Sequence, residues 1–421
     1  MTTAAAPPAR TLSGLALGLS LLVVAANLRP TLTALGPVLS LVAAGTGLSP
    51  AALGVLGSVP LLAFALVSPF VQLLSRRWGP DRTVFAATAV MLLATLLRSL
   101  PGPTLTLWAG TVVLGAGIAV CNVLVPSLVK RDFPREVPLM TGAYTATLSL
   151  SAALASGLSL PIAERGGWRL GIGVWALVGV LVLVAWLPRL RHHDRDVVPP
   201  LTSVGPSPVT PSDALAGALP ATVPGAPGDA RVSVWRSPLA WQVTTFMGTQ
   251  AIFFYLMVTW LPSIEVARGV SPVRAGWDLF LFQVTGIAGG MLVSFAMRGR
   301  RDHRLAGVAV STGMALAMLG LLLLPDLDAL WLVVAGLSSG ASLVVALSFV
   351  AERSRSSADT ARLSGMVQSV GYLLGIIGPI GAGALFQATG GWTSTLVAVV
   401  GVNLVQLVVS LFAGRDAYVG G

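Results

Sequence analysis

The sequence predicts an all-α integral membrane protein with twelve transmembrane helices in two six-helix halves, and three observations lead to that fold. Hydrophobic residues make up 55% of the 421 residues and charged residues only 10%, which leaves too little polar surface for a soluble protein. Apolar stretches of about 20 residues or more, each long enough to cross the core of a bilayer, recur along the chain. Short motifs of the first half also reappear in the second half.

Hydropathy places six spans in each half of the chain. The first six are expected at residues 12–43, 50–74, 82–100, 104–129, 138–163 and 169–188. The other six are expected at residues 238–263, 272–297, 303–324, 328–350, 360–387 and 391–413. The first span lacks a small-residue cleavage site and eleven more follow it, so we do not expect a signal peptide.

The spans divide the chain into an N-terminal bundle, residues 1–188, and a C-terminal bundle, residues 238–421. Residues 189–237 connect them, and within this linker residues 199–227 carry eight prolines together with Ser, Thr, Gly and Ala. A segment of this composition cannot bury a core, so we expect it to be a disordered tether.

The two halves repeat one another in the same order. Three motif pairs carry the repeat, at offsets of 222, 223 and 224 residues: Gly47-Leu48-Ser49-Pro50 with Gly269-Val270-Ser271-Pro272, Thr141-Gly142 with Ser364-Gly365, and Gly166-Gly167-Trp168 with Gly390-Gly391-Trp392. Three matches at a steady offset indicate two copies of one six-helix unit. Because both copies begin on the same side of the membrane, they are parallel repeats with a solute site expected near the midplane between them.

The distribution of basic residues gives the orientation. Twenty of the 26 Lys and Arg fall in one alternate set of loops and ends, five fall in the opposite set, and Arg29 lies within a span. Basic residues concentrate in cytoplasmic loops, so both termini and the linker are expected in the cytoplasm. We expect a multi-pass protein of a bacterial inner membrane.

Composition and motifs exclude several functional classes. The sequence pI of about 11.2 could suggest a nucleic-acid partner, but the basic residues are placed as orientation signals, so we expect none. The only cysteine, Cys121, cannot form an intrachain disulfide, and the three histidines lie in basic loops. We find no catalytic triad, metal-ligand set or nucleotide-binding motif, and therefore expect neither an enzyme nor a cofactor.

The basic loop between spans two and three, residues 76–82, resembles a degenerate form of the cytoplasmic loop motif of the major facilitator superfamily. Residues 298–304 are its counterpart in the second half. The resemblance covers the whole chain outside the linker. It implies a transporter with the twelve-helix fold and a monomer as its default state.

Two further motifs resemble one branch of that superfamily, the cyanate/2-nitroimidazole (CynX/NimT) transporters. One is Asn27-Leu28-Arg29-Pro30 followed by Gly36-Pro37 in span one. The other runs from Asn122 to Lys130 at the end of span four and continues with Asp132-Phe133-Pro134. This resemblance implies transport of small anionic or polar compounds, by uptake or by efflux.

Arg29 lies near the middle of the first span, and no acidic residue lies at a comparable depth in any other span. An unpaired charge at that depth is costly and usually marks a functional site. The guanidinium group offers two parallel donors to planar oxyanions. Pro30 should break the helix beside it, which is tolerated only where protein or a water-filled cavity covers the backbone. We therefore expect Arg29 to bind the solute.

Uncharged polar residues at a similar depth are the other candidates for solute binding. They are Asn27, Asn122, Gln250, Tyr255, Gln283, Gln368 and Tyr372. Gln368 and Tyr372 share a helix face, whereas Asn27 and Arg29 point in different directions unless the Pro30 kink rotates them. Hydrogen bonding between helices is the alternative role for each.

Two acidic residues near the outer rim, Glu265 and Asp278, are candidates for gating or for coupling to protons. Arg268 and Arg274 are close in sequence, so an ion-paired gate is one expectation. Proton relays in membranes need such acidic groups, so a coupling role is the other.

The sequence thus predicts a secondary carrier for a small anionic or polar solute, related in chemistry to cyanate, nitrite, nitrate or a nitroimidazole. The solute would be held at Arg29 while the two halves rock between inward-open and outward-open states. The alternative is a multidrug or toxicant efflux carrier in which Arg29 is structural. A receptor is disfavoured because the linker carries no ordered signalling domain.

Overall fold

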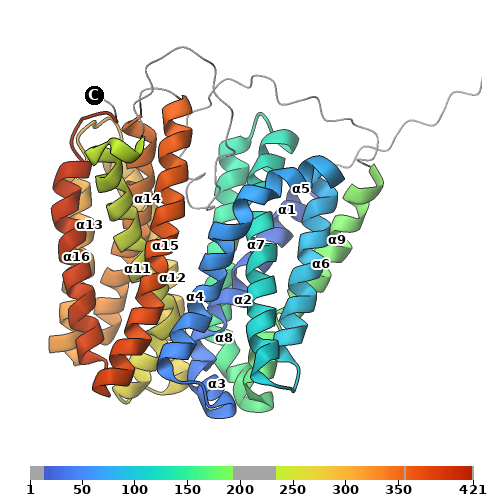
Figure 1. The fold of residues 1–421 in the computed structure, drawn as a ribbon, viewed down its shortest axis with the longest axis horizontal. Helices are drawn as coiled ribbons and strands as arrows, with labels where there is room; N and C mark the ends of the chain where they lie inside the picture. Colours follow the sequence, from blue (N-terminus) through green and yellow to red (C-terminus); the bar gives the residue numbers. More distant parts are fainter. Residues whose placement is uncertain (1–13, 193–233, 355–356, 420–421) are drawn as a thin grey trace, which may run out of the picture.

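The computed structural model describes residues 14–192, 234–354 and 357–419, and every regular element in these ranges is a helix (Figure 1). Eleven of the described helical segments are long and apolar enough to cross a membrane, and the shorter apolar helix Ala176–Leu190 supplies a twelfth. The predicted all-α membrane fold is confirmed. The linker, residues 189–237, was expected to be disordered, and its residues 193–233 lie outside the described residues. Its two ends differ from that expectation, because residues 189–192 are helical and Val234–Arg236 form a 3-10 turn.

In the N-terminal half the first two spans are interrupted and the others are nearly continuous. Its elements are α1 (Gly14–Leu28), α2 (Pro30–Thr33), η1 (Gly36–Val38), α3 (Leu39–Thr46), α4 (Pro50–Val67), η2 (Ser68–Phe70), α5 (Val71–Trp78), α6 (Pro80–Ser99), α7 (Thr104–Asp132), α8 (Val137–Gly173) and α9 (Ala176–His192). Helix α8 contains the fifth span and the start of the sixth. Gly166 and Gly167 leave the helical conformation and so mark the boundary between the two spans. Gly167 has φ of 80°, a conformation that favours glycine.

The C-terminal half consists of longer uninterrupted helices. Its elements are η3 (Val234–Arg236), α11 (Pro238–Ala267), α12 (Pro272–Ala296), α13 (Arg304–Leu323), η4 (Pro325–Leu327), α14 (Asp328–Glu352), α15 (Ser357–Thr389) and α16 (Thr393–Ala413). Ser271 and Pro272 of the repeated motif begin α12, with the Ser271 hydroxyl accepting from the backbone N–H of Arg274. Ser49 and Pro50 begin α4 in the same way, so this repeat is a helix-start signal.

Large apolar side chains cover the outside of the molecule as well as its core. Leu15, Leu105 and Leu305 are each at least 70% exposed. Such residues would be unfavourable in water and are the expected contacts with lipid. The outer surface therefore agrees with the membrane assignment.

Charged residues tie the helices together at the end of the molecule where the linker attaches. In the N-terminal half, Asp81 of α6 pairs with Arg131 (2.5 Å) and Arg189 (3.0 Å), and Arg189 also pairs with Asp132. In the C-terminal half, Arg353 donates instead to the carbonyl oxygens of three residues: Ala413, Gly414 and Arg301. Arg131 and Arg189 therefore meet a carboxylate network in one half, whereas Arg353 meets backbone carbonyls in the other.

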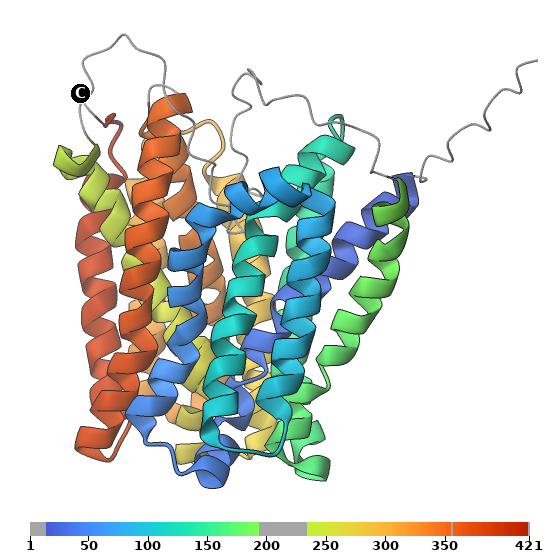
Figure 2. The same cartoon turned by 45° about the vertical axis from the view of Figure 1, so that its right-hand side comes forward.

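The two halves meet mainly at the opposite end, where α4 lies beside α15 (Figure 2) and α8 packs against α12. Glycines allow this approach. A Cβ atom at Gly54 would come within 2.9 Å of the carbonyl carbon of Pro379, and one at Gly276 within 2.9 Å of the Ser156 carbonyl oxygen. An apolar cluster that includes Leu53 and Trp260 spans both halves at this end. This end is therefore closed by close backbone packing.

Candidate functional site

The first span breaks at Arg29. Helix α1 ends at Leu28 and α2 begins at Pro30, which has no N–H and so cannot continue the hydrogen-bond ladder of α1. The Arg29 carbonyl accepts from the N–H groups of Leu32 and Thr33, both at 3.0 Å. The break between α1 and α2 therefore places Arg29 at an irregular point of the backbone inside the bundle.

Arg29 lines a small cavity of about 40 Å³, which we call the Arg29 cavity. Its walls come from both halves of the protein: Thr31, Leu32, Thr33, Leu35, Gly36, Leu56, Gly57, Pro60, Leu61, Phe64, Arg98 and Thr111 from the first, and Phe254, Tyr255, Val258 and Thr259 from the second. No acidic residue is among them. The volume is large enough for a few atoms or water molecules.

The Arg29 guanidinium has no hydrogen bond or ion pair to any described residue. Its charge acts on three tyrosines: Tyr144, Tyr255 and Tyr372. Tyr144 belongs to α8 in the first half, while Tyr255 and Tyr372 belong to α11 and α15 in the second. Hydroxyl-bearing aromatic rings from both halves therefore lie within electrostatic range of the cation, which lacks a counter-ion within the described chain.

Two of the other predicted solute-binding residues lie near Arg29. Tyr255 lines the Arg29 cavity. Tyr372 is in electrostatic reach of Arg29 and packs edge-on against Phe64 with ring centroids 6.5 Å apart. A solute-binding role for Tyr255 and Tyr372 stays a prediction.

The remaining five predicted residues do not line the Arg29 cavity. The Asn27 side-chain oxygen lies toward Gly179 of α9, inside the first half. Gln283 donates to Ser156 across the two halves, and Gln368 donates to Ser364 one turn earlier in α15. Asn122 is half-buried on α7 and Gln250 is buried on α11.

Two residues near Arg29 were not among the sequence candidates. Arg98 lines the cavity although it stands near the end of the expected span 82–100, as one of the five basic residues of the opposite set. Tyr144 is 1% exposed, and its hydroxyl has no hydrogen-bond partner among the described residues. Its position inside the expected span 138–163 was the signal that could have found it.

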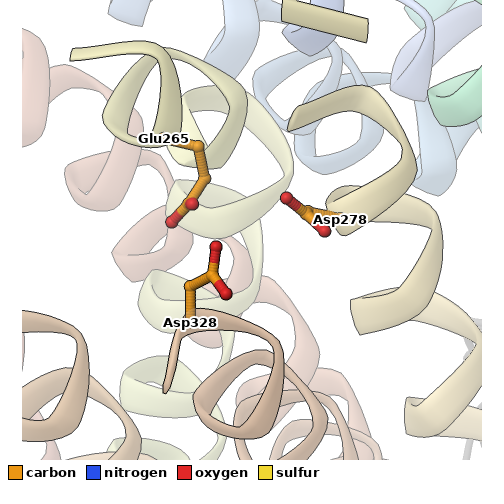
Figure 3. A group of neighbouring side chains, drawn as sticks. All are labelled: Glu265, Asp278 and Asp328. Carbon is orange, nitrogen blue, oxygen red and sulfur yellow. The ribbon is translucent and has the colours of Figure 1, made fainter. Parts of the chain in front are cut away.

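Glu265 and Asp278 come together with a third carboxylate, Asp328, at the end away from the linker (Figure 3). Figure 3 shows the carboxyl groups of Glu265 and Asp328 pointing toward one another. Arg274 pairs with Asp328 at 2.7 Å and lies 3.7 Å from Asp278, while Arg268 lies 4.0 Å from Glu265. Three carboxylates and two arginines thus connect α11, α12 and α14.

Comparison with known proteins places this architecture in a family. The model of the Major Facilitator Superfamily matches residues 15–335. The chain belongs to that superfamily. It is 36% identical over 400 residues to the 2-nitroimidazole transporter of Escherichia coli K12, covering 94% of each chain. It is 23% identical over 395 residues to the cyanate transport protein CynX of the same organism, covering 92% of this chain and 96% of the relative.

A second relative of similar identity and one solved structure complete the comparison. The chain is 35% identical over 400 residues to the uncharacterized transporter YycB of Bacillus subtilis 168, covering 94% of this chain and 92% of that one. A bacterial homologue of the human lysosomal transporter Spinster shares the fold, with a TM-score of 0.72 at 15% identity over 99% of this chain and all of the other. The protein is therefore a membrane transporter of the cyanate/2-nitroimidazole branch and not an enzyme.

Proposed function

We propose that this major facilitator protein is a secondary carrier for a small anionic or polar solute, which it binds at Arg29 and releases by alternating access. The observation that carries the proposal is a permanent cation in a cavity that no acidic residue lines. A charge in that position is stable only with a partner, and a solute anion supplies one in the loaded state. The names of the relatives, 2-nitroimidazole and cyanate transporters, support a compact solute rich in electrons.

The packing of the halves supports a specific conformational state. Their close contacts lie at the end away from the linker, and by the distribution of basic residues that end faces outward. In this orientation the termini and the linker lie in the cytoplasm, and the protein is closed to the outside. Rocking to the outward-open state must separate α4 from α15 and α8 from α12.

Glu265 and Asp278 serve as part of the outer gate in this proposal. Their ion pairs with Arg268 and Arg274 are local to α11 and α12 at the closed end, and the Glu265 side chain is completely buried. Arg274 also pairs with Asp328 and so joins α12 to α14. Replacing Glu265 by Gln removes the charge and retains the shape. If the residue couples transport to protons, the variant should catalyse exchange of solute between two compartments but lose accumulation driven by a pH gradient. Retained accumulation would leave Glu265 with a gating role only.

The function is tested by solute counterflow in vesicles that contain the purified protein. Arg29→Gln should abolish counterflow of cyanate, nitrate or 2-nitroimidazole, and Arg29→Lys should retain part of it because the charge remains while the paired donors are lost. The matched control is Arg165→Gln, an exposed arginine in α8, which should transport normally. Wild-type counterflow of cationic dyes, unchanged in Arg29→Gln, would instead indicate an efflux carrier in which Arg29 is structural.

A further inference from the structure

A second arginine, Arg98, is among the residues that line the same cavity, and its hydrogen-bond donors are only partly satisfied. Its side chain is 2% exposed, and its Nη1 donates to the Thr31 carbonyl oxygen at 3.0 Å. The other two nitrogens, Nε and Nη2, are buried and have no hydrogen-bond partner in the described part of the chain. A buried charged group with two idle donors is unfavourable unless something else occupies those donors.

The two idle donors of Arg98 lie on one edge of the guanidinium plane. Nη1 lies on the same side of the guanidinium group as Cδ. Its bond to the Thr31 carbonyl oxygen therefore leaves the edge formed by Nε and Nη2 unused. The Nε–H and the neighbouring Nη2–H then point in parallel away from the side chain. This edge matches two oxygens of a planar oxyanion, which accept both hydrogens together.

The surroundings of Arg98 contain nothing that balances its charge. Among the residues that line the cavity, Arg29 is a second cation and none is acidic. Two guanidinium groups around a space of about 40 Å³ repel one another in a medium of low dielectric constant. An anion between them reduces that repulsion and supplies acceptors for both groups.

We propose that Arg98 is a second solute-binding residue that selects a planar group with two oxygens on one edge, such as a carboxylate, nitrate or nitro group. A linear anion such as cyanate has only one terminal atom to place against this edge. The inference rests on the proposed function, since it concerns the solute that Arg29 binds. Arg29 supplies the general attraction for the anion, and Arg98 distinguishes the shape of its acceptor group.

The test is the ratio of dissociation constants for sodium cyanate and sodium nitrate, measured by titration calorimetry on purified protein. Wild type should bind nitrate at least about tenfold more tightly than cyanate, since one charge-assisted hydrogen bond changes affinity by that order. Arg98→Lys retains the charge but not the two-donor edge, so the ratio should fall toward one while cyanate still binds. Comparing ratios between variants cancels the different hydration of the two anions.

Three outcomes separate this inference from the function on which it rests. A wild-type ratio near one, or an undiminished preference for nitrate in folded Arg98→Lys, would refute the role of Arg98. The wild-type ratio is informative even if the variant fails to fold. Arg29→Gln should lose affinity for both anions, and this expectation does not depend on the ratio between nitrate and cyanate. Unchanged binding in Arg29→Gln would overturn the proposed function, whatever Arg98 does.

Discussion

Gln283 of α12 donates its side-chain N–H to the Ser156 hydroxyl of α8 at 2.6 Å and so joins the two halves of the transporter. The same amide lies 3.4 Å from the Ala152 carbonyl oxygen, which also accepts from the Thr33 hydroxyl beside the Arg29 cavity. The contact between the halves is thus connected through one carbonyl to the broken first span. Separation of the halves must break the hydrogen bond between Gln283 and Ser156.

Replacing Gln283 by Leu should therefore shift the protein toward the outward-open state. A hydrogen bond between membrane helices contributes about 0.6 kcal/mol on average, so the shift should be roughly threefold. The readout is labelling of Leu56→Cys, a buried cavity residue, by an impermeant maleimide added outside, in a Cys121→Ser background. The control is Ser294→Ala, because the Ser294 hydroxyl donates within its own helix. Equal labelling in both variants would contradict the linkage.

A side chain at Gly54 should open the same end by a steric route. The Cβ of Gly54→Ala would meet the backbone of Pro379 and Ile380 across the interface, and overpacking of this kind costs about 1–3 kcal/mol. Labelling of Leu56→Cys should rise several-fold and counterflow should slow. Gly381→Ala, in the facing helix α15, has no atom within 4 Å of the added Cβ and should behave as wild type.

The charge network of the first half should contribute to stability and not to solute binding. Arg189 and Asp132 form a pair whose side chains are 1% and 3% exposed. In Asp132→Asn the Arg189 charge is left less compensated, a change that costs about 3–5 kcal/mol when a buried pair is broken. Thermal unfolding in detergent should show a clear loss. Asp302→Asn breaks only an exposed pair with Arg304 and should cost under about 1 kcal/mol.

Tyr144 should contribute to solute binding without contributing to stability. Its buried hydroxyl has no partner among the described residues, so Tyr144→Phe removes an unsatisfied group and should leave thermal unfolding unchanged or slightly raised. If the hydroxyl contacts the bound anion, affinity should fall by about threefold to tenfold. Tyr418→Phe, 38% exposed near the C-terminus, is the control. Undiminished anion affinity in Tyr144→Phe would exclude that contact.

The sequence predicted the fold well because hydropathy and helix-start motifs are local signals. Twelve apolar stretches required only length and composition, and the Pro30 break followed from the missing N–H of one residue. The span limits were less accurate: α7 continues to Asp132, three residues beyond the expected end. Polar residues extend helices past the apolar core wherever capping and ion pairs stabilise the last turn.

The site was harder to predict because it depends on which helix each face meets. The position of Arg98 near the end of the expected span 82–100 indicated a basic residue at the membrane surface, but its side chain donates to the Thr31 carbonyl inside the bundle. Depth alone also selected Gln283 and Gln368, and the structure shows both bonded to serines outside the Arg29 cavity. Periodicity gives the direction of a side chain relative to its own helix and not the identity of its neighbour.

The closed end and the cavity rest largely on different residues. Gly54 and Pro379 approach one another at the closure, whereas Arg29, Tyr255 and Arg98 line the cavity. Mutations can therefore change the cavity without changing the closed end. Substitutions in the cavity would alter which solute is bound and leave the alternating-access cycle intact. Duplicated copies of one such gene can therefore evolve to transport different solutes by the same conformational change.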